Sequence, residues 1–391
     1  MLEIARPALD PRTAADTATV EGGSTVVTIQ YLRAIAASLV VCHHAFAPPA
    51  VNSYYRHSFG EFGVDLFFVI SGYIMWTTTV RGRRGPVPFW AARIVRIVPL
   101  YWVYTTLFLL VAIFAPQALF TEAGLDAVFV LKSYLFVPAL HPTYGGIAPV
   151  YTLGWTLNYE MFFYLVFGFS LVLARPALRF GLFAGLFVLL VLAGWMTGPR
   201  GAILSTYTNP ILLEFLAGVA LAALGPRLMR SAAGVGLAAL LVAAAWLVFV
   251  VLSEAPPGRL VAFGLPAAVI VAGALMLEPI ARLRTSRLAL LLGDASYSIY
   301  LAHPFAQRVW LLAVGLLVPD LGAPVVAALY VSSALLIGIL GGVASYLLLE
   351  RPLLAAGHRL IGRSSLSRRT MAMESGQGSK PAGSETVRNP G

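Results

Sequence analysis

The sequence has few charged residues: Asp, Glu, Lys and Arg make up 11% of its 391 residues, whereas 59% are hydrophobic. A soluble globular domain usually carries about 25% charged residues. This shortage excludes a soluble enzyme and a disordered protein. The single cysteine, Cys42, cannot form an internal bridge, which excludes an extracellular disulfide scaffold. The composition is that of a membrane protein.

Lysine is almost absent, since Lys132 and Lys380 are the only two, so the formal net charge of +10 comes from arginine. The arginines gather in short segments between apolar runs. The positive-inside rule produces this placement, so the charge indicates membrane topology before it indicates a partner, and we expect no nucleic-acid partner.

Several motifs are missing as well. The sequence has no GxxxxGK[ST] loop, no HExxH and no Cys/His cluster, so we predict neither nucleotide hydrolysis nor a metal site. Residues 1–28 lack the basic and apolar regions of a signal peptide, and we interpret them as a disordered cytoplasmic lead. Residues 29–352 form one hydrophobic block, interpreted as a single transmembrane domain. Residues 353–391 are predicted to be a basic, largely disordered cytoplasmic tail.

The fold class that follows is an all-α integral membrane protein with about ten transmembrane helices, because a spanning helix needs about 20 mostly apolar residues. The shorter apolar stretch 124–138 carries Lys132 near its middle, and we interpret it as a re-entrant or interfacial helix, with an eleventh span as the alternative. The predicted spans are 29–48, 61–79, 97–116, 151–173, 178–197, 207–224, 231–252, 260–278, 291–313 and 323–349.

The charges of alternate loops test this arrangement. With ten spans both termini lie on one side, and every second loop shares that side. Those loops and the tail carry most of the arginines, whereas the opposite loops hold only Arg56, Lys132, Arg200 and Arg259. This asymmetry predicts cytoplasmic termini in a multi-pass protein of the bacterial inner membrane.

Ionisable residues within the predicted spans are functional candidates by default, because each costs at least about 2.5–3.5 kcal/mol on insertion scales. They are Arg33, His43, His44, Asp65, Glu160, Glu214, His303 and Arg308.

Arg33 and His44 are eleven residues apart in YLRAIAASLVVCHH, which is close to three helical turns. They therefore share one helix face, about 16 Å apart along the axis, whereas His43 points about 80° away. Arg33 snorkelling to the headgroups and histidines bonding to neighbouring helices would be a structural explanation. The alignment of His44 with an intramembrane arginine favours a functional one.

Arg93 and Arg96 are spaced i, i+3 at the start of a span, in the segment RIVRIVPLYW. In one interpretation, such clustered arginines do no more than set the membrane topology. They also suit a phosphate-rich ligand, because guanidinium pairs bidentately with phosphate. The spacing leaves both interpretations open.

Among the other ionisable residues, Glu160 is the strongest candidate, because it lies about 13 Å below the outer surface in an aromatic segment. Glu214 is similarly deep in a plainer helix, and His303 precedes Pro304; for both, structural and functional roles stay open. Asp65 lies near the outer end of its span, where a helix cap or contact with water would explain it. Close helix packing is the expected role of Gly63, Ser71 and Gly72.

These residues fit two classes of function. One is group transfer across the membrane, with a phosphate-bearing cytoplasmic donor, a general base and an acceptor outside. The other is proton-coupled transport, with the carboxylates and His44 as a relay. No inverted repeat is evident in the sequence, which weakens transport.

The motifs also resemble those of the membrane-bound acyltransferase-3 family, within it the exopolysaccharide-production acetyltransferases. YLRAIAASLVVCHH is similar to the family's opening motif, with Arg33 and His44 at the matching positions. FGVDLFFVISGYIMW, RIVRIVPLYW, WTLNYEMFFYL, EFLAGVAL, YSIYLAHP and YLLLERP follow in the family's order. The resemblance covers residues 29–352.

The resemblance implies O-acyl transfer, usually of acetyl from acetyl-CoA as co-substrate, to a hydroxyl of a surface carbohydrate or polysaccharide, free or lipid-linked. Acyl-CoA would bind from the cytoplasm, with Arg33, Arg93 and Arg96 holding its phosphates. His44 would deprotonate the acceptor or carry the acyl group, and Glu160 would orient the imidazole. Asp65, Glu214 and His303 are further candidates.

Alternative acceptors are a lipid or a small molecule such as a macrolide, and the alternative class is a proton-coupled carbohydrate transporter. Many relatives carry an extracytoplasmic domain after the last helices, where this sequence has a short tail. We therefore expect the outer loops or a partner to select the acceptor. Membrane lipids are the other expected partners.

Overall fold

The computed structural model describes residues 26–46, 59–80, 85–115, 126–143, 145–317 and 324–361. In these ranges the chain is helical, and its extended pairing is limited to one isolated antiparallel bridge between Leu140 and Ile147. The prediction of an all-α protein is confirmed. Nearly all of the predicted lead and most of the predicted tail lie outside the described residues.

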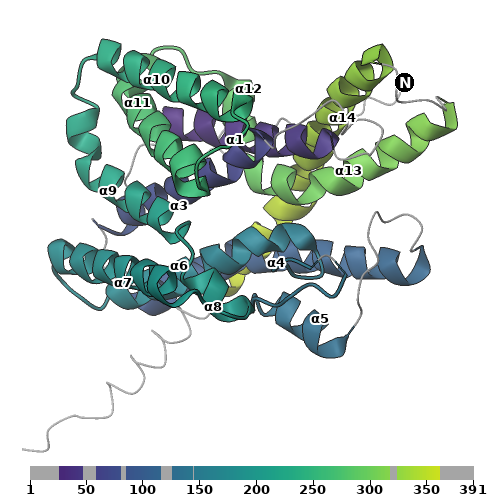
Figure 1. Cartoon of the computed structure of the whole chain (residues 1–391), viewed down its shortest axis with the longest axis horizontal. Coiled ribbons are helices and arrows are strands. Elements are labelled where there is room, and N and C mark those ends of the chain that lie inside the picture. The colour runs from purple at the N-terminus through teal and green to yellow at the C-terminus, as the bar shows by residue number, and fades with distance from the viewer. Residues whose placement is uncertain are drawn as a thin grey trace, which may run out of the picture.

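The first helix, α1, lies at the centre of the fold although it is among the most polar (Figure 1). Its buried positions include small residues such as Ala36 and Ala37, which let several helices approach it closely. Around α1 (Val27–Ala45) pack α3 (Phe62–Thr79), α11 (Leu265–Ala281), α12 (Arg287–Asp294), α13 (Ser296–Leu317) and α14 (Pro324–Ser345).

The remaining helices extend this arrangement on both sides. Figure 1 shows α4, α6 and α7 along one side of the molecule, and the hairpins α10–α11 and α13–α14 along the other. Helix α9 joins the two sides, because it packs on α3, α7 and α11. These helices are α4 (Pro86–Phe114), α5 (Ala127–Tyr134), α6 (Trp155–Ser170), α7 (Pro176–Thr197), α8 (Ala202–Tyr207), α9 (Leu212–Leu228) and α10 (Ala233–Leu252).

Glycines set the close approach of α3 to its neighbours. A Cβ at Gly63 would collide with the carbonyl oxygen of Ala36 in α1, and a Cβ at Gly72 with that of Phe215 in α9. In return, a Cβ at Gly218 of α9 would collide with the carbonyl oxygen of Val69. The predicted packing role of Gly63 and Gly72 is confirmed.

Seven helices in the described part of the chain are long and apolar enough to cross a membrane. The three predicted spans outside this group correspond to α1, α6 and α13. Polar residues of α1 and α13 lower the hydropathy of these helices, and α6 has only 16 residues. The seven are Phe62–Thr79, Pro86–Phe114, Pro176–Thr197, Ala202–Leu228, Ala233–Leu252, Leu260–Ala281 and Pro324–Ile361.

The segment 124–138, described from Asp126 on, contains the 8-residue helix α5, capped by the Asp126 side chain, which accepts from the Phe129 amide. Such a helix is about 12 Å long and too short to cross a bilayer. At the other end of the chain, the helix that begins at Pro324 continues to Ile361, nine residues past the predicted boundary at 352.

Candidate active site

A large cavity of about 1460 Å³ lies between α1, α3, α4, α6 and α13. It brings together four of the five residues that the sequence singles out most strongly: Arg33, Arg93, Arg96 and Glu160 all line it. These residues come from three helices that are far apart in the sequence. The fold therefore gathers the predicted donor-binding arginines around one space.

Neutral groups hold the Arg33 side chain in place. Its Nη1 donates to Gln30 Oε1 at 2.9 Å and its Nη2 to Ser296 Oγ at 3.0 Å. Asp294 lies one step further away, accepting from Gln30 Nε2 at 3.1 Å. Arg33 is thus oriented without direct pairing to a carboxylate, which keeps its charge available to the cavity.

Arg93 and Arg96 enter the cavity from one face of α4, as the i, i+3 spacing predicts. The Arg93 guanidinium lies 5.9 Å from the centre of the Phe89 ring, and its buried Nε has no hydrogen-bond partner among the described residues. The ion pairs found in the described ranges involve other basic residues. Together with Arg33, these two side chains leave several donors free for an anion.

Glu160 is anchored in the cavity wall by two hydroxyl groups. Ser71 Oγ donates to Glu160 Oε1 at 3.0 Å, and Tyr164 Oη donates to the same oxygen. Tyr164 follows Glu160 by one helical turn and packs at right angles to Phe89, the ring beneath Arg93. Ser71, for which the sequence suggests only a packing role, therefore also fixes this carboxylate.

His44 lies outside the residues that line the cavity and is paired with another histidine. Its Nδ1 bonds to the carbonyl oxygen of Val40 at 2.9 Å, and its ring centre lies 4.9 Å from that of His303. His303 Nδ1 bonds to the carbonyl of Ile299 at 2.9 Å. The structure thus places His303, and not Glu160, beside His44.

Tyr300 lies between the cavity and the two histidines. It lines the cavity, and its ring centre lies 6.4 Å from that of His303. Its hydroxyl donates to the Leu153 carbonyl at 2.8 Å and lies 2.9 Å from Thr156 Oγ1. The cavity and the histidine pair are therefore neighbours, with the fixed Tyr300 side chain between them.

A second polar cluster contains Asp65 and Glu214, away from the cavity lining. Asp65 is 0% exposed and pairs with Arg259 Nη2 at 2.8 Å, while Arg259 Nη1 reaches Glu61 at 3.2 Å. Glu214, 1% exposed, has no hydrogen-bond partner for either carboxylate oxygen within the described ranges. His43 also faces this cluster, with its Nε2 3.9 Å from Glu61.

Arg259 is the centre of this cluster. Burial lowers the pKa of its guanidinium, but the neighbouring carboxylates, chiefly those of Asp65 and Glu214, outweigh burial and raise the pKa above its ordinary value. Arg259 thereby ties the segment before α11 to the N-terminal end of α3. The arrangement gives Asp65 a structural partner.

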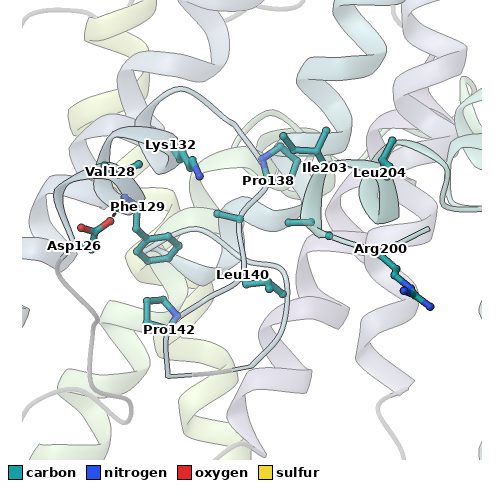
Figure 2. A pocket seen from close by; sticks show the side chains of 13 residues that line it. Asp126, Val128, Phe129, Lys132, Pro138, Leu140, Pro142, Arg200, Ile203 and Leu204 are labelled. Carbon is teal, nitrogen blue, oxygen red and sulfur yellow. Dashed lines mark hydrogen bonds between the residues drawn. The ribbon is translucent and has the colours of Figure 1, made fainter. Parts of the chain in front are cut away.

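A smaller pocket of about 530 Å³ lies between the segment around α5 and the start of α8. Figure 2 shows that apolar side chains such as Phe129, Pro138 and Leu140 surround it together with Lys132, while Arg200 is directed away from the others. None of the sequence-predicted site residues lines this pocket. In the described part of the chain no group of three or more His, Cys, Asp or Glu residues could hold a metal ion.

Sequence reasoning missed the partners of the site residues. Gln30 and Tyr164 lie one turn from Arg33 and Glu160, so helical spacing gave a signal for both. Ser296 and the pairing of His303 with His44 depend on contacts between helices more than 250 residues apart in the chain. No local pattern marks such contacts.

Comparisons with known proteins identify the family of the chain that forms this cavity. Residues 26–343 match the family described as an acyltransferase domain. The chain belongs to the acyltransferase-3 family. It is 42% identical over 308 residues to the exopolysaccharide production protein ExoZ of Rhizobium meliloti (strain 1021), covering 78% of this chain and 92% of that protein.

A second relative is more distant. The acyltransferase MdmB of Streptomyces mycarofaciens is 29% identical over 300 residues, covering 68% of this chain and 75% of its own. No solved structure matches the chain. Family membership and the membrane-capable helices together identify a multi-pass membrane acyltransferase.

Proposed function

We propose that this acyltransferase moves an acetyl group from cytoplasmic acetyl-CoA to a hydroxyl of a cell-surface or exopolysaccharide carbohydrate. The observation that carries the proposal is the cavity, in which Arg33, Arg93 and Arg96 converge without carboxylate partners among the described residues. Similarity to an exopolysaccharide production protein supports the carbohydrate as acceptor.

The arginines suit the phosphates of the donor. Coenzyme A carries a diphosphate and a separate phosphate, and planar guanidinium groups bind such oxygens bidentately. Glu160, held by Ser71 and Tyr164, would balance the positive charge of the cavity when no donor is bound. We assign it this role in preference to orienting the His44 imidazole, since its hydrogen bonds go to these two hydroxyls.

His44 is the proposed general base, and its tautomer supports this. A carbonyl oxygen can only accept a hydrogen bond, so the contact with Val40 requires the proton on Nδ1 and leaves a lone pair on Nε2. Nε2 would take the proton of the acceptor hydroxyl while the oxygen of that hydroxyl attacks the thioester carbonyl. As the C–S bond breaks, the thiolate of coenzyme A would recover that proton. The same lone pair could instead accept the acyl group as an acyl-imidazole.

The proposed topology keeps ten spans, with α1, α6 and α13 crossing the membrane beside the seven apolar helices. Buried helices tolerate polar residues because other helices, not lipid, surround them. Both termini would be cytoplasmic, and the protein would lie in the inner membrane. The 530 Å³ pocket would then face outside, where we propose that it contacts the acceptor.

The direct test uses the purified protein in lipid nanodiscs with radiolabelled acetyl-CoA and the cell's polysaccharide or its lipid-linked precursor. We expect label in the carbohydrate without any membrane gradient. Carbohydrate transport that requires a proton gradient, with no acetyl transfer, would support a transporter instead. Comparison of polysaccharide O-acetylation by NMR between a deletion strain and its parent would identify the acceptor, and unchanged acetylation would point to a lipid or a small molecule.

A further inference from the structure

His303 is a buried imidazole whose second ring nitrogen has nothing to bind. The residue is 0% exposed, and its Nε2 has no hydrogen-bond partner among the described residues. Buried polar atoms of this kind are rare, because each costs the free energy of its lost hydration. An unsatisfied nitrogen next to a proposed base therefore needs an explanation.

The tautomers explain why the nitrogen is unpaired. His303 Nδ1 bonds to the Ile299 carbonyl, so it carries the proton and Nε2 is a bare acceptor, as in His44. Two imidazoles with bare Nε2 atoms cannot hydrogen-bond to each other through them. Their ring centres nevertheless lie 4.9 Å apart, which is close enough for such a bond once one Nε2 gains a proton.

We propose that His303 is a positioning residue that stabilises His44 in its protonated state. When His44 Nε2 takes the proton of the acceptor hydroxyl, the new N–H points at the acceptor oxygen and can share its proton, in a three-centre hydrogen bond, with the lone pair of His303 Nε2. The hydrogen bond would exist only while His44 carries the proton, so it would favour the transition state over the ground state. The proton then returns through His44 to the thiolate of coenzyme A. This inference rests on the proposed function of His44.

The surroundings hold His303 in the orientation that this role requires. Its Nδ1 is tied to its own helix, and a Cβ at Gly338 of α14 would lie 3.4 Å from the His303 Cβ, so α14 packs directly against it. One turn further along α13, Gln307 Nε2 donates to the Val41 carbonyl at 2.9 Å and links α13 to α1. The two histidine-bearing helices are thus locked at one distance.

The position of His303 predicts which kinetic constant it affects. It does not line the donor cavity, so binding of acetyl-CoA should not depend on it. A loss of protonated-state stabilisation should appear in kcat and leave the KM for acetyl-CoA unchanged.

Two amide substitutions separate this role from packing. In His303→Gln the amide oxygen reaches the place of Nε2, whereas in His303→Asn the shorter amide reaches only the place of Nδ1. We expect His303→Asn to lower kcat about 10- to 100-fold and His303→Gln to keep it close to native, both with native KM for acetyl-CoA.

The outcomes separate the hypotheses when kcat is measured per folded molecule in nanodiscs. Native kcat for His303→Asn, or equal losses for the Gln and Asn variants, would overturn the inference while leaving the proposed function intact. A native protein that transfers no acetyl from acetyl-CoA would overturn both.

Discussion

His43 and His44 are adjacent in the sequence, but they meet different neighbours. His44 pairs with His303, whereas His43 faces Glu61 in the Arg259 cluster. We expect His44→Ala to lower acyl transfer per folded molecule by about 10²–10⁴-fold, because the general base is lost. His43→Ala should keep substantial activity. Turnover of both purified variants checks this, and an inactive His43→Ala with an active His44→Ala would reassign the base.

Arg93 and Arg96 test the donor site. Replacing either with Ala should raise the KM for acetyl-CoA by about tenfold or more, because a charged hydrogen bond contributes roughly 1.5–3 kcal/mol. Lysine should restore little, since it keeps the charge but loses the planar fork. Isothermal titration with coenzyme A gives an independent measure of affinity. Native affinity in the lysine variants would indicate that both residues only set the membrane topology.

Lys132 and Arg200 test the outer pocket. Both contribute to its lining, but Figure 2 shows Arg200 directed away from the other side chains. Lys132→Ala should therefore raise the KM for the carbohydrate acceptor about tenfold without changing the KM for acetyl-CoA. Arg200→Ala is the control, expected to stay near native. The reverse pattern would show that the acceptor binds on the other side of this pocket.

At the residue scale, the sequence predicted the features that depend on helical periodicity better than those that depend on contacts between helices. The eleven-residue spacing placed Arg33 and His44 on one face, and the structure directs Arg33 to the cavity and His44 to His303. The sequence also paired Glu160 with His44, which the structure does not bring together through hydrogen bonds. The partner of an imidazole depends on which helices pack against it, and local sequence does not encode that choice.

At the scale of helices, the contact between α3 and α9 depends on Gly72 and Gly218. We expect Gly72→Ala to lower stability by about 1–3 kcal/mol, because its Cβ would collide with the carbonyl of Phe215. Gly185→Ala in α7 is the matched control, since its Cβ meets no neighbouring heavy atom within 4 Å. Thermal unfolding in detergent measures both. An unchanged Tm for Gly72→Ala would show that the two helices can separate without cost.

The same scale shows what hydropathy can predict. Seven apolar helices coincide with predicted spans, because lipid-facing residues such as Leu189 and Leu241 must be apolar. Helices α1, α6 and α13 carry His44, Glu160 and His303, and neighbouring helices cover much of their surface. Hydropathy therefore identifies the apolar helices readily and the helices that carry these polar residues poorly.

For the whole molecule, the arrangement of arginines predicts an orientation. After Cys42→Ala, a cysteine introduced at Pro256 should react with an impermeant thiol reagent in intact cells, and a cysteine at Gly85 should react only after lysis. The two positions belong to loops that the ten-span topology places on opposite sides. Labelling at Gly85 in intact cells would contradict that topology.

The arginines of the donor cavity have a further consequence for the cell. In the proposed function they hold the phosphates of the donor, which are the same before and after the acyl group leaves. Released coenzyme A would keep these contacts and compete with fresh acetyl-CoA for the cavity. Turnover would then follow the cytoplasmic ratio of acetyl-CoA to free coenzyme A, so product inhibition would couple decoration of the cell surface to carbon status without a separate regulatory site.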